Sequence, residues 1–201
     1  MSVLEEINTQ AENNPLTKEE LKKQFVEKTK GLNLKHSFNF DEAWEIGQEL
    51  VRRQTFRNKI IDLENKMINH SGSMSKKELH EKNPVKHSFA DGCYIREIFN
   101  PAGELLITKI HKKEHPFFLL EGKMSILTED GVEHLEAPHY GITRPGTKRI
   151  IYTHTDCVFV TVHATEKKDI KEIEKDVIAD NFDDPAISIE ELKMLTKNKK
   201  I

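Results

Sequence analysis

The chain has 201 residues, enough for one hydrophobic core and an additional segment. Charged residues make up 32% and apolar residues 36%, which predicts that part of the chain is a solvated extension. The net charge of −3 gives no reason to expect binding to nucleic acid or to an anionic membrane. No apolar run approaches the roughly 18 residues of a membrane span, and the first residues do not form a secretory signal. We therefore expect a soluble, cytoplasmic protein.

Residues 1–75 are predicted to form a helical N-terminal extension. Thr17 and Glu20 have the spacing of a capping box, which indicates a short helix through Leu21, Phe25 and Lys28. A longer helix should begin after Asn39 or Asp41, because apolar residues then recur every three or four positions as far as Met67. Its apolar stripe must pack on its own domain, on a second copy or on a partner. A Ser- and Gly-containing linker over residues 70–77 follows as the expected domain boundary.

Residues 84–165 have the pattern of short strands separated by turns. Strand-like runs begin at Cys93 and continue to His163, with turn residues at Asn100-Pro101, Asp130-Gly131 and Pro145-Gly146. This rhythm predicts an antiparallel β-barrel or sandwich. The two cysteines, Cys93 and Cys157, are expected to be buried thiols in strands.

Residues 166–201 are predicted to form C-terminal helices and a basic tail. Thr165 is the expected cap of an amphipathic helix that carries Ile170, Ile173, Val177 and Ile178 on one side. A last short helix is expected from Ser188 to about Leu195.

His111 and His115 are the most informative residues of the β region. Alternate residues of a strand share a face, so the two imidazoles can point the same way if the backbone between them is extended. Converging imidazoles suit a transition metal, and a catalytic metal site generally needs three protein ligands. His163, at a strand end, and His154, in the preceding turn, are the candidates for the third ligand, with His163 preferred because strands hold side chains more rigidly.

The spacing of this region resembles the cupin superfamily. Gly103 is followed by five residues and Lys109-x-His111, then by three residues and His115, then by six residues and Gly122. Lys109 stands where the first cupin histidine is expected, and His115 where the glutamate is expected. In the second signature Arg149 replaces a histidine. The stretch also looks like small cupin-like proteins encoded by bacteriophages.

This resemblance implies a mainly β, cupin-like jelly roll over residues 84–165 and a homo-oligomer. It also implies a divalent transition metal such as Zn, Fe, Ni or Mn in the barrel. Lys109 and Arg149 can only donate hydrogen bonds, so they would bind an anion or a carboxylate instead.

Three functional hypotheses follow from these residues. The first is a metal site on His111, His115 and a third histidine, able to activate water or bind oxygen. The second is a metal-free pocket that binds an anionic small molecule through Lys109, Arg149 and the histidines. The third is a rigid assembly module with a vestigial pocket, associated with a virion or a host protein, whose N-terminal helical arm contacts other phage proteins.

Overall fold

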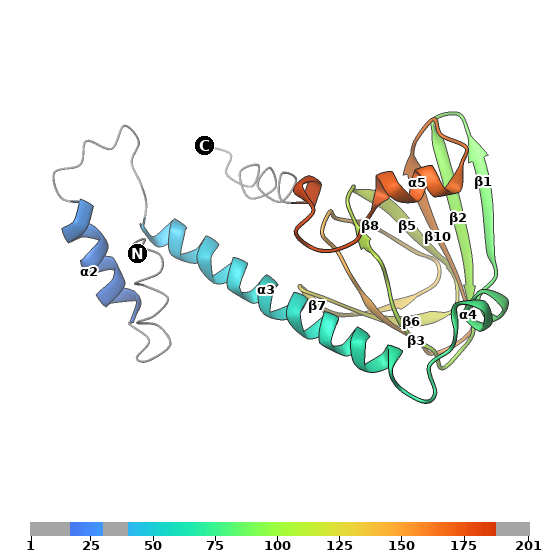
Figure 1. Cartoon of the computed structure of the whole chain (residues 1–201), viewed down its shortest axis with the longest axis horizontal. Helices are drawn as coiled ribbons and strands as arrows, with labels where there is room; N and C mark the ends of the chain where they lie inside the picture. Colours follow the sequence, from blue (N-terminus) through green and yellow to red (C-terminus); the bar gives the residue numbers. More distant parts are fainter. Residues whose placement is uncertain (1–16, 30–39, 188–201) are drawn as a thin grey trace. The chain divides into compact units, whose positions relative to one another are not determined.

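The computed structural model describes residues 17–29 and 40–187. The chain divides into two compact units, residues 1–51 and 52–201 (Figure 1). None of the described helices is both long enough and apolar enough to span a bilayer.

The first unit contains α2 (Lys18–Thr29) and the beginning of α3 (Phe40–Ile68). The predicted capping box is present, because the Thr17 amide donates to Glu20 Oε2 over 2.8 Å and the Glu20 amide donates to Thr17 Oγ1 over 3.3 Å. The Phe40 ring lies 5.6 Å from Phe25 and 6.4 Å from Trp44, between ring centroids. Both predicted helices of this region are therefore confirmed where the structure describes them.

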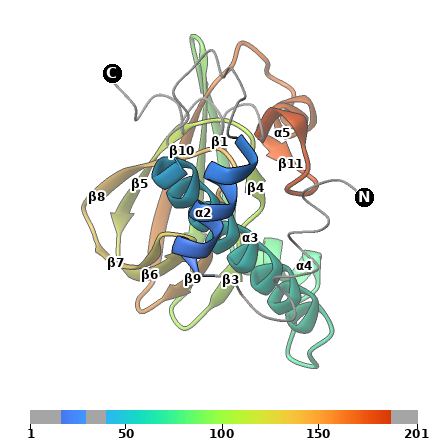
Figure 2. The same ribbon diagram turned by 90° about the vertical axis from the view of Figure 1, so that its left-hand side faces the viewer.

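The second unit is built on two antiparallel sheets, with α4 (Lys76–Lys82) and α5 (Ile170–Val177) placed around them (Figure 1). The strands of the first sheet, in spatial order, are β1 (Val85–Ala90), β2 (Cys93–Asn100), β10 (Cys157–Ala164), β5 (His115–Glu121) and β8 (His139–Thr143). Those of the second are β3 (Leu105–Ile107), β9 (Ile150–Thr153), β6 (Lys123–Thr128) and β7 (Gly131–Glu136). A two-stranded pair joins β4 (Ile110–His111) to β11 (Ile178–Ala179), on the same side as α5 (Figure 2).

The core lies between the two sheets. Phe117, Leu119 and Phe159 come from the first sheet, and they form one buried cluster with Met124 and Ile126 of the second. Alternation along β5 and β10 places every second side chain in this core. The predicted mainly β, jelly-roll arrangement with helices before and after it is confirmed.

Two details at the C-terminal end differ from the prediction. Asp169, not Thr165, caps α5, because its carboxylate accepts from the Glu172 amide over 3.0 Å. Ile178 lies outside α5 and pairs with His111 in the β11–β4 ladder. Apolar periodicity could not separate the last helical turn from this strand, since Ile178 packs against the same cluster as Ile173. The expected helix over residues 188–195 lies outside the described residues.

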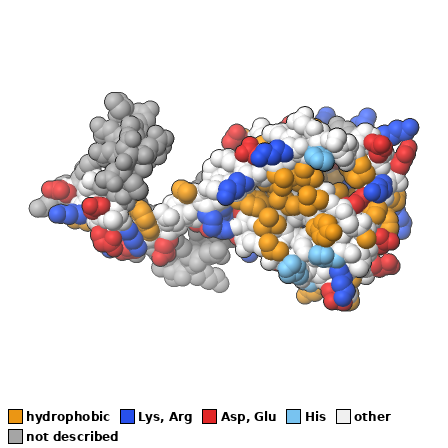
Figure 3. Space-filling view, turned by 90° about the horizontal axis from the view of Figure 1, so that it is seen from below, with side chains coloured by type: hydrophobic (Ala, Val, Ile, Leu, Met, Phe, Trp, Pro, Cys, Tyr) orange, Lys and Arg blue, Asp and Glu red, His pale blue; other side chains and the backbone are white. Residues whose placement is uncertain are grey.

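One row of side chains on the outer face of the second sheet is apolar. Ile107, Ile150, Leu127 and Val132 are register partners on successive strands and so form one row across the sheet. Figure 3 shows hydrophobic side chains gathered in a broad patch on this unit, with histidines at its edge.

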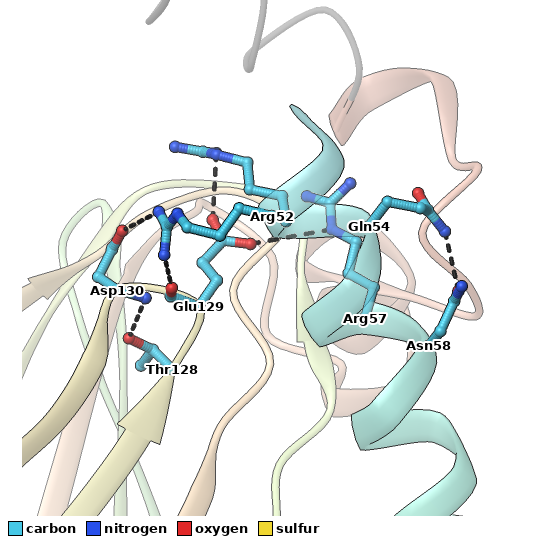
Figure 4. A network of polar contacts seen from close by, with 8 residues as sticks. Arg52, Gln54, Arg57, Asn58, Thr128, Glu129 and Asp130 are labelled. Atoms are coloured by element: carbon cyan, nitrogen blue, oxygen red, sulfur yellow. Dashed lines mark hydrogen bonds and ion pairs between the residues drawn. The ribbon is translucent and has the colours of Figure 1, made fainter. Parts of the chain in front are cut away.

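The part of α3 in this unit is held to the β6–β7 turn by charged contacts (Figure 4). Glu129 accepts from Arg53 over 3.1 Å and lies 3.9 Å from Arg57, while Arg52 contacts the Glu129 carbonyl and Asp130. Arg57 is 8% exposed, so Glu129 compensates a buried charge, whereas Asp130 lies largely in solvent.

We expect Glu129→Gln to lower the free energy of unfolding by about 2–3 kcal/mol, because it removes a largely buried carboxylate charge that pairs with Arg53 and with the buried Arg57 guanidinium. Asp130→Asn is the matched control and should cost under about 1 kcal/mol, as exposed pairs contribute little. Urea unfolding followed by circular dichroism measures both. Equal effects of the two substitutions would contradict the importance of the buried charge.

Candidate functional site

Three of the four predicted histidines meet inside the second unit. His111 comes from β4, His115 from the first position of β5 and His163 from β10. The ring centroid of His115 lies 4.4 Å from that of His111 and 4.3 Å from that of His163, and His111 and His163 are 6.1 Å apart. The structure therefore brings together the predicted pair and the preferred third histidine, although the backbone between His111 and His115 is not extended but bends at residues 112 and 113.

These imidazoles are held neutral by their surroundings. Burial, together with the neighbouring His115 and Arg149, lowers the pKa of His111 to about 2. Burial lowers the pKa of His115 and of His163 to about 4, with Arg149 contributing at His115 and Arg96 at His163. At neutral pH each ring is thus uncharged, with one nitrogen to donate and one to accept.

Arg149 is the most unusual charge in this region. It is 5% exposed, and its Nη2 donates to Thr143 Oγ1 over 2.7 Å. Its guanidinium carbon lies 4.9 Å from the centroid of the Phe117 ring, which can approach because Gly141 opposite has no side chain. Burial lowers the pKa of Arg149 to about 10, which leaves it charged at neutral pH. No ion pair joins it to a described carboxylate, although the charge of Glu133 in the neighbouring cavity favours its protonated form.

A second cation of the interior, the half-buried Arg96, was missed by sequence reasoning. It lies on β2 in register with Thr161 of β10, two positions from Tyr94 and from Ile98, which also face inward. Burial lowers the pKa of Arg96. The signal that could have found it is this alternation, since a residue between two inward apolar positions shares their face.

Arg96, Arg149, His111 and His163 line one pocket of about 290 Å³. The rest of its wall is mostly apolar and comes from both sheets and from α5: Tyr94, Ile98, Leu106, Ile107, Ile151, Phe159, Ile173, Val177 and Ile178. The predicted ligand-binding Lys109 also lines it, but its side chain is 63% exposed and pairs with Glu174 over 3.1 Å. Lys109 therefore lies at the rim with its charge neutralised, unlike Arg149.

The histidine cluster has the donor chemistry of a transition-metal site but not its arrangement. His111 Nδ1 and His115 Nε2 are buried and have no hydrogen-bond partner, so both nitrogens could ligate. However, His163 Nε2 lies 3.2 Å from Thr161 Oγ1, and within residues 17–29 and 40–187 no group of three or more His, Cys, Asp or Glu side chains is placed to hold a metal ion. The two neighbouring arginines also repel a divalent cation.

His154, the other predicted third ligand, lies elsewhere. Its Nε2 is 2.6 Å from the hydroxyl oxygen of Ser125, and His134 Nδ1 contacts the same oxygen over 2.7 Å. Ser125 belongs to β6 and pairs in register with His134 on β7. The His154 side chain is exposed on this sheet, whereas His111 and His163 line the pocket and the His115 ring lies against both of them.

Arg149 also borders a second cavity, of about 380 Å³. The walls of this cavity include Phe56 of α3, Phe182, and the acidic residues Glu129 and Glu133. The acidic residue of the histidine pocket, Glu174, pairs with Lys109, so Arg96 and Arg149 give that pocket an excess of positive charge.

Comparison with known proteins gives likenesses of fold. No family model matches the sequence, and no curated protein matches it. A cupin-2 domain protein from Shewanella frigidimarina is similar in structure with 11% identity and a TM-score of 0.35, over 40% of this chain and 79% of that one. An RmlC-like cupin with a double-stranded β-helix fold, from Methanocaldococcus jannaschii, is similar with 18% identity and a TM-score of 0.36, over 41% of this chain and 79% of that one. A cupin superfamily protein from Desulfitobacterium hafniense is similar with 13% identity and a TM-score of 0.35, over 42% of this chain and 81% of that one. The chemistry of the site rests on the residues of this chain alone.

Proposed function

We propose that the protein binds a small anion in the pocket lined by Arg96, Arg149, His111 and His163. The observation that carries the proposal is Arg149, a buried cation without a carboxylate partner among the described residues. An uncompensated buried charge is costly, and a protein generally retains one where a ligand supplies the counter-charge.

The charge of the pocket wall supports this proposal. Its charged residues are Arg96, Lys109, Arg149 and Glu174. The opposite charges of Lys109 and Glu174 neutralise each other in an ion pair at the rim. Two positive charges remain inside. The neutral imidazoles add hydrogen-bond donors without adding charge, and guanidinium groups bind carboxylates in a bidentate way. The low dielectric of the interior strengthens each of these contacts.

Arg149→Met provides the test, because methionine keeps much of the volume and removes the charge. We expect the affinity for benzoate and for inorganic phosphate, measured by isothermal titration calorimetry, to fall at least tenfold, since a buried charge-assisted pair is lost. The free energy of unfolding without ligand should stay within about 1 kcal/mol of the wild type or rise, because a desolvated charge has been removed.

Arg144→Met is the matched control. Arg144 is an exposed arginine that lines the second cavity and not this pocket, so its loss should change the affinity less than threefold. Failure of wild-type protein to bind either anion at millimolar concentration would overturn the proposal. Equal affinities of the Arg149 variant and the wild type would do so as well.

A divalent transition metal is the second candidate, favoured by the two unpartnered nitrogens His111 Nδ1 and His115 Nε2. These two and a ring nitrogen of His163 would hold it, and the metal would supply Lewis-acid chemistry when bound. Elemental mass spectrometry on untagged protein and on His111→Ala/His115→Ala tests this. About one metal per chain, lost in the double variant, would support a metal site, and its absence from both would remove this candidate.

The assembly hypothesis, with association of copies and contacts to phage proteins, stays a prediction. It requires a defined oligomer, which light scattering on the purified protein measures. A monomer whose fold and solubility do not depend on the pocket residues would leave ligand binding as the better account.

A further inference from the structure

Resting on the proposed anion site, we infer a ligand class: a small monocarboxylate with an apolar body of about six to ten carbon atoms. Two positive guanidinium groups and an apolar wall occupy different parts of one pocket, and an amphipathic acid satisfies both at once. The inference depends on where each kind of side chain lies along the strands.

The polar end of the pocket is fixed by strand register. Arg96 is opposite Thr161 on the neighbouring strand, and His163 is opposite Tyr94. His111 and His163 lie 6.1 Å apart between ring centroids, and Arg149 is close enough to both His111 and His115 to lower their pKa. Donors from three strands and from the segment before β9 thus gather at one end, where a carboxylate can accept several hydrogen bonds.

The apolar wall lies one side-chain step further along the same strands. Ile98 follows Arg96 on the inner face of β2 and is opposite Phe159 on β10. Two residues of a strand advance by about 6.6–6.8 Å, so this apolar pair lies within reach of the hydrocarbon body of a ligand whose carboxylate contacts the arginine. Leu106 and Ile151, partners across the second sheet, also line the pocket.

α5 adds apolar side chains at the other end of the pocket, where they pack against Tyr94. Ile173 is fully buried and Val177 is 6% exposed, and both line the pocket together with Ile178. The capping of α5 by Asp169 and the ladder between β11 and β4 fix this apolar face. An inorganic anion such as phosphate has no group that could contact these side chains, which is why a carboxylate with a hydrocarbon body is the better fit.

The volume sets the size of the ligand. At about 290 Å³ the pocket lies at the lower limit of small-molecule sites. A water molecule takes about 30 Å³ in the liquid, so a pocket of this volume accommodates about ten non-hydrogen atoms. Subtracting the three atoms of the carboxylate leaves about seven carbon atoms for the apolar body, which lies within the stated range.

Calorimetric titration of the full chain with acetate, butyrate, hexanoate, octanoate and dodecanoate tests the inference. Affinity should rise about fourfold for each added methylene up to octanoate, the factor expected for burying one such group, and then level off or fall at dodecanoate because the pocket is full. 1-Octanol, which has the body without the charge, should bind at least tenfold more weakly than octanoate. Inorganic phosphate should bind no better than acetate.

A pair of adjacent leucines provides the variant test. Leu106→Ala shortens an apolar side chain of the pocket wall. It should lower the affinity for octanoate at least fivefold and leave the affinity for acetate unchanged. Leu105→Ala is the control, because Leu105 is 45% exposed and faces the other way, and it should leave both affinities unchanged.

The outcomes separate this inference from the proposed function. If acetate and phosphate bind in an Arg149-dependent way but affinity does not grow with chain length, the anion site stands and the monocarboxylate inference is wrong. If no anion binds, both are wrong. If 1-octanol binds as tightly as octanoate, the apolar wall alone selects the ligand, and the inferred class is again wrong.

Discussion

Gly122→Ala should destabilise the protein by at least about 4 kcal/mol, or prevent folding. Gly122 joins β5 to β6 with a φ of +89°, a conformation that costs an L-residue roughly 1–2 kcal/mol. A Cβ at this position would also lie 2.1 Å from the Asp156 carbonyl oxygen and 2.7 Å from Cys157 Sγ, both on the chain entering β10. Overpacking of this kind adds about 1–3 kcal/mol or more. Urea unfolding followed by far-UV circular dichroism measures the loss.

Gly103→Ala separates the two causes. Gly103 has a similar φ of +79°, but a Cβ there would meet nothing within 4 Å. Its substitution should therefore lower the free energy of unfolding only by the backbone strain, roughly 1–2 kcal/mol. If the two variants lost the same stability, the close approach of the β5–β6 junction to residues 155–157 would not be a constraint on folding.

Acid should destabilise the protein steeply between about pH 6.5 and pH 4. The folded-state pKa values of His115 and His163 are about 4, below the usual value of about 6.5 for the unfolded chain. As the pH falls below 6.5, the unfolded chain takes up protons that the folded chain does not, so the free energy of unfolding decreases. Each such histidine contributes about 1.4 kcal/mol per pH unit. With His111, whose pKa is lower still, the loss by pH 5 should be several kcal/mol, and stability should be level above about pH 7.5.

Urea unfolding at a series of pH values, in a buffer free of carboxylates, measures this slope. His163→Gln should reduce it by about 1.4 kcal/mol per pH unit, because glutamine has no proton to gain. His80→Gln is the control, since His80 is exposed on α4 and its ring stays in water. A slope that is the same in wild type and in His163→Gln would show that these buried rings do not govern acid sensitivity.

Turn residues and strand alternation were sufficient to predict an antiparallel β-barrel or sandwich and the strand end that supplies His163, because the residues at a turn and the period of two within a strand require no knowledge of pairing. The jelly roll followed from the resemblance of the motif spacing to cupins. The meeting of His111 with His115 was predicted for an extended backbone, whereas residues 112 and 113 form a bend between β4 and β5 in the structure.

Which charged residues enter the pocket could not be predicted from the sequence, because it depends on tertiary contacts. Arg96 and Lys109 are both basic residues in or near strands, yet Arg96 enters the pocket and Lys109 reaches solvent at its rim. Lys109 falls in the gap between β3 and β4, where alternation no longer fixes direction, and α5, 65 residues later, provides its partner Glu174. His154 was misplaced for a similar reason, because its partner Ser125 becomes its neighbour only through the pairing of β6 with β9.

The contact of Ser125 with two histidines has a consequence for proton positions. A serine hydroxyl carries one hydrogen, and nitrogens of both His134 and His154 lie within 2.7 Å of its oxygen. When both rings are neutral, only one of them can accept that hydrogen, so the other must donate. Because the contacts use Nδ1 of His134 and Nε2 of His154, both rings then carry their hydrogen on the same kind of nitrogen, either both on Nε2 or both on Nδ1. Protonation of the accepting ring turns the serine into an acceptor from both sides and directs its own hydrogen elsewhere, which couples two side chains from different strands through a single hydroxyl group.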